Sequence, residues 1–143
     1  MPDVNDWNAK VIEEFRANEG RVASYFDGAP VVLLHHVGRR TGTEYVNPVM
    51  YLRDEDDPRT IFVFASKSGM PTNPDWYVNL TQAGHSTVEV GAETYAVLVR
   101  DVTGEERDRI YAIQASRYPF FAEYERTTAG IRTIPVLALT REG

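Results

Sequence analysis

The chain has 143 residues, no cysteine and a formal net charge of −6, from 21 acidic and 15 basic side chains. This length is typical of a single domain, and the lack of cysteine excludes disulfides, thiolate nucleophiles and Cys-based metal sites. The negative charge argues against a general nucleic-acid binder, whose affinity depends on neutralising phosphates. Only Lys10 and Lys67 are lysines, so arginine supplies the other 13 bases. Arginine favours planar, bidentate contacts with anions. We expect one domain over residues 1–143.

The sequence shows neither a targeting signal nor a membrane span. Residues 1–6 are polar and acidic, unlike the basic start of a secretory signal. The longest apolar run, from Ala29 to Leu34, is far too short to cross a bilayer. We therefore expect a cytoplasmic protein.

The first predicted element is an amphipathic helix within residues 1–20. Its apolar residues recur at intervals of three and four, as on one helix face: Val4, Trp7, Val11 and Phe15. Gly20 is expected to end the helix in a left-handed conformation. A helix packed on the core explains this pattern. A surface helix that touches lipid or borders a pocket explains it as well, because Trp and Phe on one face suit both.

Six segments are predicted to be strands because their apolar residues alternate or run continuously. They are residues 31–37, 43–53, 60–66, 86–90, 93–100 and 133–140. Turns separate most of them, including the glycine-framed turn Gly38–Gly42 and a hairpin turn at Gly91-Ala92. Pro48 has no backbone N–H, so we expect its strand to lie at an edge or to contain a bulge there.

Three further helices are expected, at residues 74–80, 103–117 and 120–127. Pro74 is tolerated in the first turn of a helix, and Asn73 is the natural cap before it. Thr103 and Glu106 have the spacing of a capping box at the start of the second of these helices.

The order of these elements predicts the fold class. Strands that follow one another through short turns favour antiparallel pairing, and six twisted strands tend to close, which removes exposed edges. We expect an α+β fold: a small barrel of about six mainly antiparallel strands with flanking helices, rather than a doubly wound sheet.

Several common catalytic centres have no support in the sequence. His35 and His36 are neighbours on a predicted strand and point to opposite faces, so they cannot grip one ion together. No HExxH, G-x-S-x-G, dinucleotide-binding or phosphate-loop motif is present. Ser66-Lys67-Ser68 places a lysine beside two serines, but sequence neighbours do not reliably form a base and nucleophile pair. We expect no metal site.

An anion-binding site has better support. The turn Gly38–Gly42 contains two arginines and a threonine, and successive N–H groups in such a turn can form a concave nest for an anion. Arginine also makes charge-assisted contacts with phosphate and carboxylate. Lys67 ends a predicted strand beside a Ser/Gly loop, so Arg39, Arg40 and Lys67 are expected to converge at one rim of the barrel. A hairpin turn made soluble by arginines is the alternative interpretation.

Two aromatic patterns accompany this signal. Trp76 and Asn79 are three residues apart and so share a helix face, and Tyr118, Phe121 and Tyr124 recur at the same interval. Core packing explains such spacing, and so does a planar ligand that uses both the ring and the hydroxyl of tyrosine. An anion rim, a small barrel and an aromatic lid together favour a flat, phosphate-bearing cofactor.

The chain resembles the deazaflavin-dependent nitroreductase family over nearly its whole length. The resemblance rests on motifs that occur in one order: Gly38-Arg-Arg-Thr-Gly42, Asn47-Pro48, Ala65-Ser-Lys67, Asn73-Pro-Asp-Trp-Tyr-Val-Asn79, Arg117-Tyr-Pro119 and Thr133-Ile-Pro135. It implies a split β-barrel similar to that of flavin-binding reductases.

The resemblance also implies a cofactor and a reaction. The cofactor is coenzyme F420, a 5-deazaflavin with a ribityl phosphate and an acidic lactyl-oligoglutamate tail. Hydride transfer from its reduced form to a quinone-like or nitroaromatic acceptor is the implied reaction. By position, the cofactor-binding residues are Arg39, Arg40, Thr41, Asn47, Pro48, Ala65, Ser66, Lys67, Trp76 and Asn79. The residues expected to act on the acceptor as catalytic residues are Ser66, Tyr118 and Tyr124.

The chain departs from the family pattern at two positions. Tyr45 stands where the family commonly has a third arginine after the glycine turn, so we expect weaker or differently placed binding of the cofactor tail. Phe121 stands where the family often has tyrosine, which removes a hydroxyl from the expected substrate side.

Two alternative functions fit the same residues. Flavin mononucleotide (FMN) carries a phosphate that would also suit Arg39, Arg40 and Lys67, and a deazaflavin-binding protein without turnover needs the same rim. By analogy we expect a possible homodimer, and peripheral membrane contact through the N-terminal helix is a further hypothesis.

Overall fold

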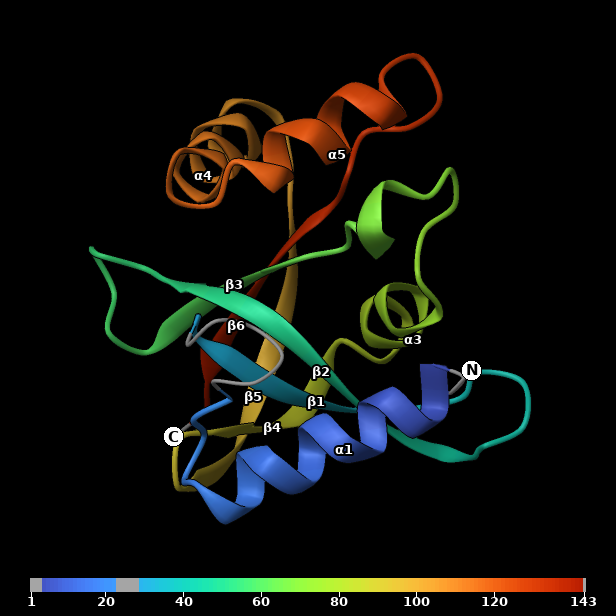
Figure 1. Cartoon of the computed structure of the whole chain (residues 1–143), viewed down its shortest axis with the longest axis vertical. Coiled ribbons are helices and arrows are strands. Elements are labelled where there is room, and N and C mark those ends of the chain that lie inside the picture. The colour runs from blue at the N-terminus through green and yellow to red at the C-terminus, as the bar shows by residue number, and fades with distance from the viewer. Residues whose placement is uncertain (1–3, 23–28, 143) are drawn as a thin grey trace.

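A closed six-stranded barrel forms the centre of the molecule (Figure 1), as seen in a computed structural model that describes residues 4–22 and 29–142. The strands are β1 (Val31–Val37), β2 (Glu44–Arg53), β3 (Thr60–Phe64), β4 (His85–Val90), β5 (Glu93–Val102) and β6 (Val136–Arg141). They neighbour one another in the order β1-β2-β3-β6-β5-β4, and each pair is antiparallel. The predicted α+β barrel and its closure are confirmed.

The last strand begins later than predicted. It was expected from Thr133, but β6 begins at Val136, where it pairs with Phe64 of β3. Pro135 lacks an N–H and contributes only its carbonyl, which accepts a hydrogen bond from the backbone N–H of Ala65.

Pro48 lies where β2 has a single neighbour, as predicted. Pro48 is opposite Leu33 of β1, whereas β3 pairs with β2 only over Tyr51–Arg53. The missing N–H of proline therefore interrupts no ladder on the other side of β2.

Alternating side chains divide each strand between the barrel interior and an outer helix layer. The interior is apolar and includes Val32, Leu34, Ile61, Val63, Val88, Val97, Leu137 and Leu139. The outer side chains of β3 and β6, such as Phe62 and Val136, pack with α4 (Gly104–Arg117) and α5 (Phe120–Thr128). These two helices lie above the barrel in the view of Figure 1, and α1 (Val4–Ala17) crosses its opposite side.

The N-terminal helix packs on the barrel through the predicted stripe. Val11 and Phe15 are buried against Val31 and Leu33 of β1, and Trp7 is partly exposed. Gly20 follows the helix in the predicted left-handed conformation, with φ of 94°. A Cβ at Gly20 would lie 2.6 Å from the Cα of Gly91, so only glycine allows the end of α1 to meet the β4–β5 turn.

One predicted helix cap, Asn73, is wrong, and the other, Thr103, lies at the predicted position but lacks the hydrogen bonds of a capping box. Helix α3 (Asp75–Ala83) begins after Pro74 without a side-chain cap, because the Oδ1 of Asn73 instead accepts a hydrogen bond from Arg132. Helix α4 has Thr103 at its N-cap, again without a side-chain hydrogen bond. Glu106 does not reach back to the cap because it pairs with both terminal nitrogens of Arg100, each at 3.0 Å.

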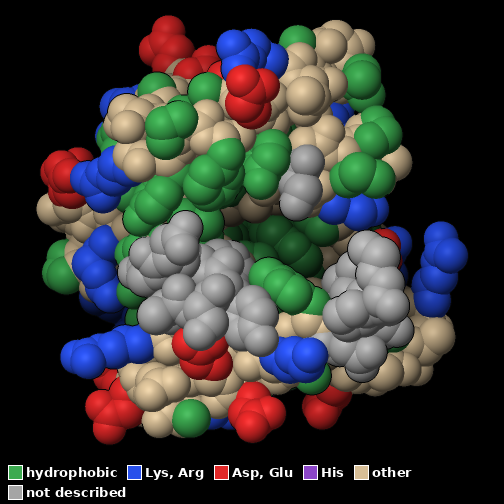
Figure 2. Space-filling view, viewed as in Figure 1, with side chains coloured by type: hydrophobic (Ala, Val, Ile, Leu, Met, Phe, Trp, Pro, Cys, Tyr) green, Lys and Arg blue, Asp and Glu red, His purple; other side chains and the backbone are tan. Residues whose placement is uncertain are grey.

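None of the helices in the described residues is long and apolar enough to cross a bilayer. Figure 2 shows apolar side chains across the middle of one face, with acidic and basic side chains gathered towards its margins.

Candidate functional site

A cleft of about 580 Å³ opens at one end of the barrel. Strands β1 and β2, the turn between them, α1, α3 and the loop after β3 all contribute to its walls. It is lined by Asn8, His36, Gly38, Arg39, Arg40, Thr41, Tyr45, Asn47, Pro48, Val49, Lys67, Pro74, Asp75, Trp76 and Asn79.

Strand register explains why polar residues gather at this end. Leu34 pairs with Asn47 and His36 pairs with Tyr45, so all four side chains continue the inward face of the barrel. Leu34 belongs to the apolar interior, whereas the next inward positions are polar or aromatic. Trp76 of α3 is buried in the same interior cluster, which places α3 beside the polar end.

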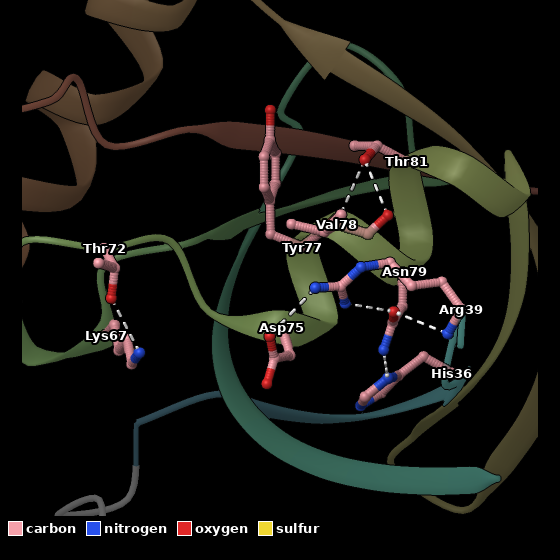
Figure 3. Close-up of polar contacts among 9 residues, drawn as sticks. All are labelled: His36, Arg39, Lys67, Thr72, Asp75, Tyr77, Val78, Asn79 and Thr81. Carbon is pink, nitrogen blue, oxygen red and sulfur yellow. Dashed lines mark hydrogen bonds and ion pairs between the residues drawn. The ribbon is translucent and has the colours of Figure 1, made fainter. Parts of the chain in front are cut away.

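A continuous hydrogen-bonded chain runs through these polar side chains, and Figure 3 shows its links from Arg39 through Asn79 to His36. The Nη1 of Arg39 donates to the Oδ1 of Asn79 at 2.8 Å, and the Nδ2 of Asn79 lies 2.9 Å from the Nδ1 of His36. On the other side of the ring, the Nε2 of His36 lies 2.5 Å from the Oδ1 of Asn47. His36 also stacks on Tyr45 with ring centroids 5.4 Å apart.

Burial acts against the charged form of the His36 ring. Burial lowers the pKa of His36 from its ordinary value, and the hydrogen bond with Asn47 offsets that effect in part. His36 is only 8% exposed, and Asn79 is 5% exposed. Buried polar groups of this kind are stable only when they are paired, and both are paired here.

The three predicted cations all line the cleft, but they differ in how each is paired within the protein. Arg39 is bound to Asn79 and lies 3.5 Å from Asp75, so it is largely engaged within the protein. Arg40 is exposed and lines the cleft, with no ion pair among the described residues. Lys67 donates to the hydroxyl of Thr72 at 3.0 Å and lies on the far side of Asp75 from Arg39 in Figure 3.

Several backbone N–H groups of the turn after β1 donate hydrogen bonds within the protein. The N–H of Gly42 donates to the carbonyl of Gly38, and the N–H of Arg39 donates to Asn79 at 3.3 Å. Gly42 has φ of 73°, in the left-handed region that favours glycine. The nest expected from this turn is therefore narrower than five residues, because three of its N–H groups have internal acceptors: the N–H of Gly38 also donates, to the carbonyl of Thr43.

One arginine that the sequence analysis did not single out anchors the loop that carries Lys67. The guanidinium of Arg132 donates to the carbonyls of Ala65, Ser66 and Met70 and to the Oδ1 of Asn73, at 2.8–3.1 Å. Its fork of donors suits several carbonyls at once, which a lysine could not match.

The anchored loop also holds Lys67 in an unusual backbone conformation. Its φ is 47°, in a region that non-glycine residues seldom adopt, and such strain persists only where the surroundings impose it. Gly69 in the same loop approaches α5 so closely that a Cβ there would lie 2.6 Å from the Oγ1 of Thr127.

The remaining predicted site residues lie outside the cleft lining. Ala65 is fully buried in the barrel interior, and the carbonyl of Ser66 accepts from Arg132. Tyr118, at the end of α4, and Tyr124, on α5, are half-buried and pack at the margin of the outer core. Phe121 is buried against Phe64 and Tyr111, and its carbonyl accepts the Tyr111 hydroxyl.

Seven lining residues were not among the predicted site residues: Asn8, His36, Gly38, Tyr45, Val49, Pro74 and Asp75. The signal for His36 was present, because it shares its parity on β1 with the interior residues Val32 and Leu34. Its neighbour His35 points to the outer face and contacts Glu89 at 2.7 Å, so the prediction that the two histidines face apart is confirmed. Gly38, Pro74 and Asp75 lie within the motifs that carry the resemblance, whereas Asn8 enters the cleft only through the placement of α1.

Comparison with known proteins identifies the relatives of this barrel. The sequence model of the F420H(2)-dependent quinone reductase family matches residues 7–141. An F420H(2)-dependent quinone reductase of Mycobacterium tuberculosis (strain ATCC 25618 / H37Rv) is similar, at 33% identity over 134 residues that cover 89% of this chain and 85% of the relative.

Solved structures agree with this similarity. The F420-H2 dependent reductase FDR-A has a TM-score of 0.65 at 31% identity, over 77% of this chain and 93% of the other. A domain-swapped dimer has a TM-score of 0.67 at 27% identity, over 96% of this chain and 99% of the other. The resemblance seen in the sequence is thereby confirmed, with F420 favoured over FMN. The chain belongs to the F420H(2)-dependent quinone reductase family and is an oxidoreductase whose cofactor is coenzyme F420.

Proposed function

We propose that the cleft at the barrel end binds coenzyme F420 and that the protein reduces a quinone there. One observation carries the assignment: in the described residues, exposed cations, an apolar aromatic wall and a paired neutral polar chain meet in this cleft. F420 combines an anionic phosphate and tail with a flat polar ring, so the residues present suit each of its parts.

The proposed contacts follow from exposure and charge. Arg40 and Lys67 would bind the phosphate and the acidic tail, because both line the cleft and are exposed. Trp76 and Pro48 would pack on the ring, with Asn47 offering a polar contact at its edge. Arg39 and Asn79 act mainly by holding the cleft polar groups in place. Thr41 would contribute to the rim.

The protein contributes orientation and exclusion of water to the reaction. When bound in its reduced form, F420 supplies a hydride for an electron-poor acceptor. No described side chain of the cleft is placed as a general base, and transfer of a hydride requires none. The buried apolar wall beside Trp76 limits water at the ring, and the paired polar chain fixes donors before any ligand arrives.

We assign the acceptor side to the loop and helix around Lys67. Ala65 and Ser66 lead into this loop, and the ring of Tyr124 borders it near Gly69. Ser66 or Tyr124 would donate a hydrogen bond to the acceptor oxygen, with Tyr118 beside them. Replacing Tyr124 by Phe should then lower turnover with menadione more than it lowers F420 affinity. Equal losses in both would contradict a catalytic role.

Three finer properties remain proposals that rest on the same cleft. A nitroaromatic compound is a second acceptor class, tested by turnover with a nitroimidazole. A homodimer is supported by the dimeric state of one related structure and is tested by light scattering. Contact of α1 with a membrane is supported by the partly exposed Trp7 and is tested by co-sedimentation with vesicles.

Fluorescence titration with F420 tests the binding assignment. Arg40→Ala should raise the dissociation constant about tenfold or more, because a charge-assisted hydrogen bond contributes roughly 1.5–3 kcal/mol. Arg109→Ala is the matched control, because Arg109 is exposed on α4 away from the cleft. Unchanged F420 affinity in Arg40→Ala would overturn the rim assignment.

The same titration separates the alternatives. Binding of FMN without binding of F420 would make the protein a flavin enzyme, and F420 binding without oxidation by menadione or any other quinone would make it a carrier.

A further inference from the structure

In the hydrogen-bonded chain of the cleft, the donor and the acceptor of each bond are fixed. A guanidinium can only donate, so the Oδ1 of Asn79, 2.8 Å from the Nη1 of Arg39, is an acceptor. The backbone N–H of Arg39 donates to the same oxygen at 3.3 Å. The Oδ1 of Asn79 thus receives two donors, which fixes the orientation of its amide.

The orientation of the Asn79 amide decides which nitrogen of His36 accepts a hydrogen bond. With its oxygen occupied, Asn79 presents its Nδ2 donors to the Nδ1 of His36, 2.9 Å away, which must therefore be unprotonated. A neutral imidazole then carries its proton on Nε2 and donates to the Oδ1 of Asn47. Each link depends on the previous one, and the chain starts at a permanent positive charge.

The last donor of this hydrogen-bonded chain lies in the cleft, on Asn47. Asn47 lines the cleft, its Oδ1 accepts from His36, and its remaining polar group is an amide that can only donate. Within the described part of the chain, no protein acceptor is recorded for that Nδ2. Polarised chains of this kind strengthen each successive donor.

We propose that His36 is a positioning residue: as its Nε2–H tautomer, it locks the Asn47 amide so that an N–H donor faces the bound ligand. The ligand edge beside Asn47 must then present a hydrogen-bond acceptor, such as a carbonyl oxygen, and an edge that presents a donor is rejected. The ligand part rests on the proposed function, whereas the tautomer is a property of the protein alone.

The charged and titratable groups around His36 come from several elements. Asp75 of α3 and Arg39 of the turn lie on the cleft side, His35 is its neighbour on β1, and Tyr45 of β2 stacks on the ring. Because these groups surround the ring, the tautomer of His36 has to be measured directly.

Nitrogen NMR of the protein labelled in histidine, without cofactor, reads that tautomer. His36 should show a protonated Nε2 and an unprotonated Nδ1 at neutral pH, with His35→Gln and His85→Gln used to assign the other two histidines. A protonated Nδ1, whether in the other tautomer or in imidazolium, would overturn the proposal.

Two replacements of Asn47 test the direction of the cleft-facing group by F420 titration. Asn47→Ala removes the donor, and Asn47→Asp, which has nearly the same shape, puts an acceptor in its place. Asn47→Asp should bind F420 at least tenfold more weakly than Asn47→Ala, and the difference should persist at high salt, where simple charge repulsion is screened. If Asn47→Asp binds F420 as tightly as Asn47→Ala or more tightly, the proposal that the ligand presents an acceptor to Asn47 is overturned.

Thermal melting of both variants shows whether each is folded, and the tautomer measurement on the wild type does not depend on them. If the wild type fails to bind F420, the proposed function fails and the ligand part of this inference fails with it. The NMR result then still decides whether His36 is locked as described.

Discussion

Buried polar side chains are fully hydrogen-bonded on the cleft side of the barrel, whereas one on the inner face of α4 is not. In the cleft, His36 and Asn79 are almost fully buried, and each has hydrogen-bond partners on both of its polar atoms. Beneath α4, Gln114 is completely buried, and neither its oxygen nor its amide nitrogen has a hydrogen-bond partner in the described structure.

The difference shows what the polar groups of the cleft are for. An unpaired buried amide costs stability, and a paired one merely recovers most of the cost of burial. A folded barrel does not need His36 or Asn79, since an apolar core would serve as well. Their complete pairing is best explained by the need for defined donors at a ligand site, whereas Gln114 has no such explanation in the structure.

Loss of Arg132, which anchors the loop that carries Lys67, should have the largest effect. Arg132→Met removes five hydrogen bonds to the 65–73 loop and should lower the free energy of unfolding by about 2–3 kcal/mol in urea titrations. Arg132→Lys should restore little, because an ammonium cannot reach the same carbonyls together.

Hydrogen exchange locates this effect. Amides of the 65–73 loop should exchange faster in Arg132→Met, with weaker F420 binding because Lys67 loses its anchor. Arg109→Met is the control on α4. Unchanged protection of the loop would show that Arg132 does not hold it.

The pH dependence of stability measures the cost of burying His36. Because burial lowers the pKa of His36 below 6.5, the unfolded chain binds the proton more readily than the folded chain. The stability linked to this group is therefore complete above about pH 6.5 and is lost as pH falls through the folded pKa. The free energy of unfolding should thus drop less between about pH 7 and pH 5 in His36→Phe than in the wild type.

His85→Gln is the matched control, since His85 is exposed on β4. Glu89 adds a separate loss at lower pH, because its hydrogen bonds from Arg16 lower the pKa of this carboxyl. Identical pH profiles of His36→Phe and wild type would mean that His36 is not buried as a neutral ring.

Gln114 should give the smallest effect, and in the opposite direction. Gln114→Met keeps the volume and removes two unpaired polar atoms, so the free energy of unfolding should rise by about 1 kcal/mol with F420 affinity unchanged. Gln82→Met on the exposed side of α3 controls for the substitution itself. Destabilisation by Gln114→Met would reveal a buried water that satisfies the amide.

Much of the fold was predictable because the pattern that encodes it is local. Alternation in 60–66, with Ile61 and Val63 against Phe62 and Phe64, separates the barrel interior from the outer core, and the structure follows it. The helix caps were not predictable in the same way. Asn73 pairs with Arg132, which is far along the chain, and Glu106 pairs with Arg100 on the preceding strand; both arginines compete with the local cap.

Those site residues that are charged or belong to a recognised motif could be predicted from the sequence. Arg40, Lys67 and Trp76 line the cleft, as expected from the turn, the loop and the resemblance. The parity of His36 on β1 marks it as inward-facing, but its pairing with Asn47 and Asn79 depends on strand register and on the placement of α3, which the sequence does not display. The roles of Ser66, Tyr118 and Tyr124 remain predictions.

The position of β6 has a consequence for how the protein acquires its activity. β6 lies between β3 and β5, so β3 and β5 become neighbours of a common strand only once residues 136–141 have been synthesised. The hairpins β1–β2 and β4–β5 join residues close in the chain and can form early, whereas β3–β6 pairing spans more than seventy residues. The barrel can therefore close only after every residue that lines the cleft, from Asn8 to Asn79, has been synthesised.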